Sequence, residues 1–144
     1  MKKLLTDKSG SSSVLFIGLV FVMLLMTMLI MELGGAYQNY YTAESVLQRS
    51  ANAALEKNMD DSYRADGILK LKTGQAKTDF TQFASEDLDG KYTLYIDSLS
   101  ATEDPPSLTA TGTITFLTVF SKYGFEDLTF NFKVSAENFE VGHD

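Results

Sequence analysis

The stretch that decides the fold is Val14 to Met31, which reads VLFIGLVFVMLLMTMLIM. It contains no charged residue, and Thr27 is its only polar side chain. At a rise of about 1.5 Å per residue, a helix of this length covers roughly 27 Å, close to the roughly 30 Å of a bilayer's hydrocarbon core. Leu33 and the snorkelling of flanking side chains supply the remainder. The run therefore predicts a transmembrane helix over residues 14–33.

The helical pattern continues beyond this run. No proline occurs between residues 14 and 59, which permits one helix of about 46 residues. The adjacent Gly34 and Gly35 are its weak point, and they predict either a bend or melted turn, or close packing of the helix. Apolar or small residues recur every three or four positions, at Leu33, Ala36, Tyr37, Tyr40, Ala43, Leu47, Ala51 and Ala54.

Charge is distributed unevenly along the chain. Residues 1–13 carry three Lys and one Asp, a balance of +2, whereas residues 14–144 carry 9 basic and 18 acidic side chains, a balance of −9. The positive-inside rule predicts that this basic leader is cytoplasmic and that everything beyond Glu32 is outside, so residues 34–59 form an extracytoplasmic continuation of the helix. An acidic domain lacks the basic face that phosphate binding needs, which excludes nucleic acid as the main partner.

Residues 60–144 are expected to form a small α+β extracytoplasmic domain. The clearest strand pattern lies at residues 108–116, where Leu, Ala, Gly, Ile and Phe alternate with threonines. Similar alternation predicts further strands at 68–72, 92–97 and 128–135. Loops are predicted at 103–106 and 121–127, and a second helix is predicted at 76–88, with an apolar stripe of Phe80, Phe83, Ala84 and Leu88.

A sheet with one apolar face needs a cover, and the candidates are the second helix and the exposed half of the first. We therefore expect an α+β fold in which a long N-terminal helix packs on a small antiparallel sheet with one extra helix. The Phe130 and Phe132 side of the last strand is expected to pack on one of the two helices, against Tyr40, Leu47 and Ala51 or against Phe80 and Phe83.

Four short motifs follow one another near the N-terminus. They are the leader end Lys8-Ser9-Gly10, the small stretch Ser11-Ser12-Ser13-Val14, Phe16, and the segment Glu32-Leu33-Gly34-Gly35-Ala36-Tyr37. In order and spacing, this region of about residues 8–58 resembles the TadE/TadG-type minor pilins of tight-adherence (Flp) pilus systems, which are related to type IV pilins.

The resemblance implies a pilin-like fold, cleavage by a prepilin peptidase between Gly10 and Ser11, and packing of the helix beside helices of other pilin or Tad-like subunits. It also implies a minor or initiating subunit, because bulk pilins of this kind are little more than the helix. Leu15 departs from the pattern, since the family has there a Glu that pairs with the N-terminal amine of a neighbouring subunit. The alternative is therefore an uncleaved single-pass anchor.

The residues expected to serve helix assembly are Leu15, Phe16, Glu32, Gly34, Gly35, Tyr37 and Tyr40. Glu32 either pairs with a basic partner at the membrane surface or marks where the helix leaves lipid. The tyrosines at 37, 40 and 41 form either a subunit contact or an interfacial aromatic belt that also packs on the sheet.

Catalytic chemistry has no support in the sequence. His143 is the only histidine and there is no Cys, so neither a zinc site nor a Ser-His-Asp set can be assembled, and no glycine-rich phosphate loop occurs. We expect no enzyme activity, no metal and no cofactor.

The predicted function is that of a structural minor pilin or pseudopilin of a Tad-type pilus or related secretion apparatus. Its partners would be the lipid bilayer, other pilins and a prepilin peptidase. The alternative is a membrane-anchored extracytoplasmic binding module outside any filament.

Overall fold

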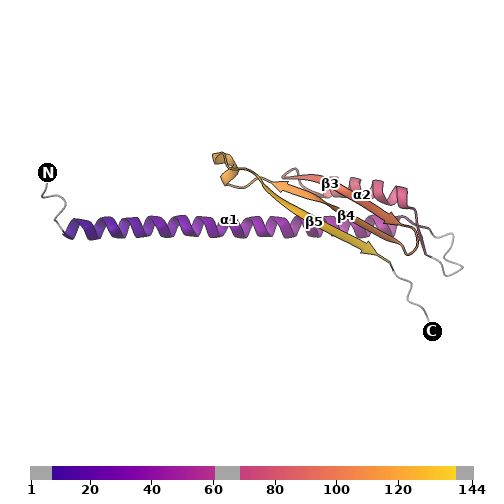
Figure 1. Ribbon diagram of the computed structural model, residues 1–144, viewed down its shortest axis with the longest axis horizontal. Coiled ribbons are helices and arrows are strands. Elements are labelled where there is room, and N and C mark those ends of the chain that lie inside the picture. The colour runs from indigo at the N-terminus through magenta and orange to yellow at the C-terminus, as the bar shows by residue number, and fades with distance from the viewer. Residues whose placement is uncertain (1–7, 61–68, 139–144) are drawn as a thin grey trace, which may run out of the picture. The chain divides into compact units, whose positions relative to one another are not determined.

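The computed structural model describes residues 8–60 and 69–138, with the backbone alone for residues 8–11. The chain forms two compact units, one ending at Tyr37 and the other beginning at Gln38. Helix α1 (Lys8–Lys57) contributes to both units. It is followed by β1 (Met59–Asp60), β2 (Lys70–Leu71), α2 (Thr73–Asp87), β3 (Tyr92–Thr102), β4 (Ser107–Phe116), the 3₁₀ helix η3 (Phe120–Tyr123) and β5 (Leu128–Glu137) (Figure 1).

The expected long helix forms, with slightly different ends. It begins at Lys8 rather than Val14, since no proline stands between these two positions, and it ends at Lys57. The helix is unbroken at Gly34 and Gly35, so the predicted melted turn is wrong. A Cβ at either glycine would meet nothing of the described chain within 4 Å.

Three antiparallel strands make the sheet of the second unit, in the order β3-β4-β5. Every second residue of β4 is buried, from Leu108 to Phe116, and the threonines between them are half-buried. On the threonine side, hydroxyl pairs link neighbouring strands at Thr109–Ser135 (3.0 Å) and Thr115–Thr129 (2.9 Å). The predicted α+β fold, with its alternating strand faces, is confirmed.

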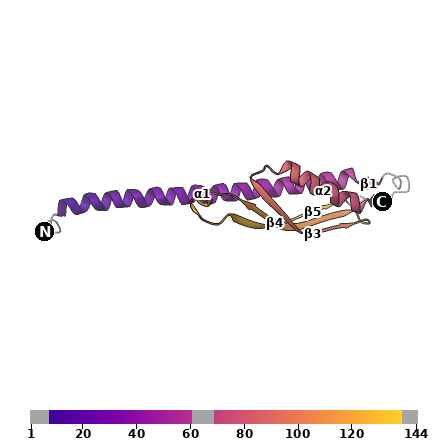
Figure 2. The same ribbon diagram turned by 90° about the horizontal axis from the view of Figure 1, so that it is seen from above.

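The core of the second unit lies between the apolar sheet face and the two helices. Figures 1 and 2 show the strands running along the part of α1 that belongs to this unit, with α2 beside it. The ring of Tyr40 on α1 lies 5.2 Å from the ring of Phe130 on β5, a contact that belongs to the first of the two predicted packings. Among the side chains no more than 3% exposed are Ala43, Leu47, Ala51, Ala54 and Leu55 of α1, Ala76, Phe80 and Ala84 of α2, and Leu108, Ala110, Ile114, Phe116, Phe132, Val134 and Ala136 of the sheet.

Strand β3 is longer than predicted because it contains a bulge. Its pairing with β4 shifts between Ile96 and Ser98, leaving Asp97 as the extra residue. Asp97 and Ser98 are both exposed, so Leu99 returns to the same half-buried face as Ile96. The predicted strand stopped at Asp97 because the simple alternation stops there, whereas the ladder runs on to Thr102.

The strand predicted at 68–72 is reduced to β2, and Ile68 lies outside the described residues. It does not join the sheet but pairs with the unpredicted β1, Met59 opposite Leu71. The Leu71 amide donates to the Glu103 carbonyl at 3.1 Å, and Lys70 forms an ion pair with the Glu103 carboxylate at 3.1 Å. This small ladder is thereby joined to the β3–β4 turn. Helix α2 begins at Thr73, earlier than the predicted Ala76.

Gly112 offers a sharp test of the bulge. It lies opposite Ile96, and a Cβ added there would collide with the Tyr95 carbonyl and reach 2.9 Å from Phe132 Cε1. We expect Gly112→Ala to destabilise the second unit by roughly 1–3 kcal/mol, as overpacking does. Gly74→Ala, where a Cβ meets nothing within 4 Å, should be neutral or stabilise by up to about 1 kcal/mol. Thermal melts of the full chain in detergent, followed by circular dichroism, measure both, and equal melting temperatures would contradict the bulge geometry.

Candidate functional site

The first candidate site is the apolar stretch of α1 in the first unit. Every large apolar side chain from Val14 to Leu33 is between 41% and 71% exposed. The Thr27 hydroxyl donates to the Met23 carbonyl at 2.9 Å, so this polar group is satisfied within the helix. Soluble surfaces rarely present so large an apolar area.

The free energy of transfer from water to the bilayer favours a membrane environment for residues 14–33. On a membrane-insertion scale, each Leu, Ile, Phe or Val near the centre contributes roughly 0.3–0.6 kcal/mol in favour of the bilayer, so the stretch gains roughly 4–8 kcal/mol. Among the described residues, α1 is the one helix long and apolar enough to cross a membrane. A membrane-spanning segment near the N-terminus is therefore physically favoured.

The residues expected to serve helix assembly are spread along α1 rather than gathered at one place. Leu15 and Phe16 are exposed, Glu32 is half-buried, and Tyr37 is 62% exposed. Tyr40 belongs to the second unit, where its ring contacts both Phe130 and the neighbouring Tyr41. Gly10 and Ser11 lie in the first turns of α1, where only the backbone is described. His143 lies outside the described residues.

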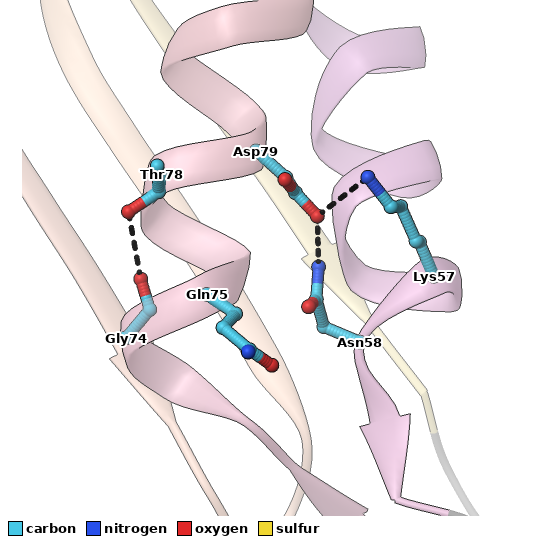
Figure 3. Close-up of a pocket in the computed structure, with 6 residues that line it drawn as sticks. All are labelled: Lys57, Asn58, Gly74, Gln75, Thr78 and Asp79. Atoms are coloured by element: carbon cyan, nitrogen blue, oxygen red, sulfur yellow. Dashed lines mark hydrogen bonds and ion pairs between the residues drawn. The ribbon is translucent and has the colours of Figure 1, made fainter.

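A second candidate is a polar depression of about 470 Å³ where the end of α1 meets α2, lined by Lys57, Asn58, Gly74, Gln75, Thr78 and Asp79 (Figure 3). Asp79 is at its centre. The Asp79 carboxylate accepts a hydrogen bond from the Asn58 amide at 2.8 Å and pairs with the Lys57 ammonium at 3.1 Å. These two contacts lower the pKa of Asp79 below its ordinary value, the Asn58 hydrogen bond having the larger effect.

Asn58 joins three elements at this point. Its side-chain amide also donates to the Ala54 carbonyl at 2.8 Å, which satisfies one of the free carbonyls at the end of α1. Its own carbonyl accepts from the Lys72 amide at 3.0 Å, next to β2. Asn58 is only 5% exposed, so these bonds are made in a largely desolvated setting.

The polar groups of the depression hold the end of α1 against α2. We call Lys57, Asn58 and Asp79 the polar contact. The charge of Lys57 is matched by Asp79, and Lys57 Nζ also lies 5.0 Å from the centre of the Phe83 ring. Within residues 8–60 and 69–138, no group of three His, Cys, Asp or Glu side chains could hold a metal ion. The arrangement links the C-terminal end of α1 to α2 through Asp79.

Comparison of the chain with protein-family models, curated proteins and solved structures finds no match. The resemblance of residues 8–58 to TadE/TadG-type pilins therefore stays a prediction. What the structure establishes is an α+β architecture with a long apolar N-terminal helix.

The substitution Asp79→Asn tests the pairing of Asp79 with Asn58 and Lys57 through the pH dependence of stability. Because the folded pKa of Asp79 is lowered, its stabilising contribution is full above the unfolded pKa, about 3.9, and is lost as the pH falls through the lowered folded pKa. Asp79→Asn should therefore lower the melting temperature at neutral pH, and the difference from the native chain should shrink below pH 4. Asp97→Asn, at an exposed carboxylate, is the control. A difference that stays constant with pH would contradict the pairing.

Proposed function

We propose that this protein is a single-pass membrane protein whose N-terminal helix anchors an extracytoplasmic α+β domain. One observation carries the proposal: α1 is unbroken from an apolar stretch with exposed side chains into a stretch whose buried stripe is part of the domain core. The exposed apolar side chains of the first stretch favour a lipid environment. The buried side chains of the second stretch attach this helix to the domain core. The basic leader and acidic domain favour a cytoplasmic N-terminus.

Within the membrane, we propose that the protein acts as a structural minor pilin or pseudopilin of a Tad-type pilus or related secretion apparatus. Its helix would pack beside the helices of other subunits. Gly18, Gly34 and Gly35 support this, because each leaves open space where a neighbouring backbone can approach closely. The order of motifs from Lys8 to Tyr37 gives independent support through the family resemblance.

Leu15 favours the second candidate, a membrane-anchored binding module that stays outside any filament. An apolar residue at this position cannot neutralise the N-terminal amine of a neighbouring subunit, and an unpaired charge in an apolar layer is costly. Both candidates are structural or binding functions, and the Asp79 carboxylate is engaged by Asn58 and Lys57.

Topology is the first test of the proposal. Protease added to intact protoplasts that express the full chain should remove the domain beyond Gln38 and leave a short membrane-bound fragment. In inside-out vesicles the same domain should be protected. Protection in intact protoplasts together with digestion in inside-out vesicles would reverse the proposed orientation.

Cleavage separates the two candidates. Co-expression with a prepilin peptidase of a Tad system should remove residues 1–10, which mass spectrometry of the mature chain detects. Gly10→Val should abolish the cut, because the added side chain obstructs the position before the scissile bond. Gly18→Val, inside the apolar stretch, is the matched control and should be cut normally. A native chain that keeps its leader in the presence of the peptidase would favour the anchored binding module.

A further inference from the structure

The connection between β4 and β5, residues 117–127, presents an unusual surface. Leu117, Val119, Tyr123 and Phe125 are 68%, 46%, 73% and 65% exposed. In the described part of the second unit, Tyr41 and Tyr95 are the only other strongly exposed large apolar or aromatic side chains. We call residues 117–127 the apolar loop.

The apolar loop is an ordered structure. The Thr118 amide donates to Ser121 Oγ at 3.1 Å, and the Ser121 amide donates to Thr118 Oγ1 at 3.3 Å, so these two residues are bonded reciprocally across the start of η3. Gly124, with a φ of 90°, ends η3 in the left-handed conformation that glycine tolerates. The Phe125 ring then returns to 5.7 Å from the Phe120 ring. The exposure of its apolar side chains is therefore fixed by local hydrogen bonds.

The loop lies at a definite end of the sheet. Phe116 and Leu128, which flank it, are paired, and the Phe116 ring stacks on Phe130 at 5.6 Å. Phe130 in turn contacts Tyr40, near the point where α1 enters the second unit. From Tyr40 back to Met31, the end of the apolar run, the helix rises only roughly 14 Å. The chain therefore tethers this end of the sheet close to the proposed membrane surface.

The two ends of the sheet differ in character. The opposite end carries the β3–β4 turn, with the exposed carboxylates of Glu103 and Asp104. The apolar loop also ends in two exposed carboxylates, Glu126 and Asp127, but before them it exposes two aromatic and two aliphatic side chains, with Lys122 among them. Exposed aromatic, aliphatic and basic side chains together are typical of segments that sit at a membrane–water interface. The exposed apolar side chains therefore lie at the tethered end, which is the end that faces the proposed bilayer.

We propose that the apolar loop inserts into the headgroup region of the membrane that holds α1, giving the second unit a second point of attachment. This inference rests on the proposed membrane insertion of α1. The occupant of the patch is lipid rather than protein, since the patch lies on the tethered end of the unit. Tyr123 and Phe125 are the residues expected to enter the acyl boundary.

The absence of Trp from the chain allows a direct test. Single-Trp variants of the full chain are reconstituted in phosphatidylcholine vesicles, with and without lipids brominated near the headgroup. Phe125→Trp should be quenched at least about twofold more than Thr102→Trp, an exposed position at the far end of β3. Tyr123→Trp is a second reporter in case the first variant does not fold. Leu24→Trp, in the apolar stretch, with lipids brominated deep in the acyl chain, reports insertion of α1 itself.

The outcomes separate the two proposals. If Leu24→Trp is quenched while both loop reporters behave like Thr102→Trp, the loop inference fails and membrane insertion stands. If Leu24→Trp is not quenched, membrane insertion fails and the loop inference fails with it. A blue-shifted loop reporter that bromine does not quench would mean that protein, such as a second copy of this chain, covers the loop, and would overturn lipid as the occupant.

Discussion

The second unit depends on the burial of one narrow stripe of α1 against the sheet. Ala43, Leu47, Ala51 and Ala54 are all fully buried, and three of the four are alanines. Small side chains let the helix lie close to the strands, so that larger residues such as Phe80 and Ile114 fill the space around it. An enlarged residue in the stripe would push α1 away from the sheet and separate Tyr40 from Phe130.

The sequence predicts the elements that have a simple period. The apolar run and the strands of β4 and β5 were predicted because each keeps one repeat along its length. The second half of β3 was missed, although its phase change from Ile96 to Leu99 and the glycine at 112 are together the signature of a bulge. Together, the phase change and the glycine predict a bulged strand that continues to Thr102.

The polar contact of Lys57, Asn58 and Asp79 was harder to predict from the sequence. An Asn directly after a helix that ends in Lys is a recognisable sign of a helix C-terminus, although Asn58 acts through its side-chain amide on the Ala54 carbonyl and not through a left-handed backbone. Its partner Asp79 could not be predicted, because one Asp on the polar side of α2 is like any other until the packing of the helices is known. The apolar loop was predicted only as a loop, since periodicity does not show which connections expose their apolar side chains.

The contacts between α1 and β5 also constrain the order in which the domain can fold during synthesis. Gln48 donates to the Ser135 carbonyl at 2.7 Å, and Tyr40 meets Phe130, so helix residues synthesised early contact strand residues synthesised late. Such long separations slow folding, because the chain between must be ordered before these contacts form. During synthesis, the apolar face of α1 therefore has no native partner on β5 until residues up to about 135 have emerged.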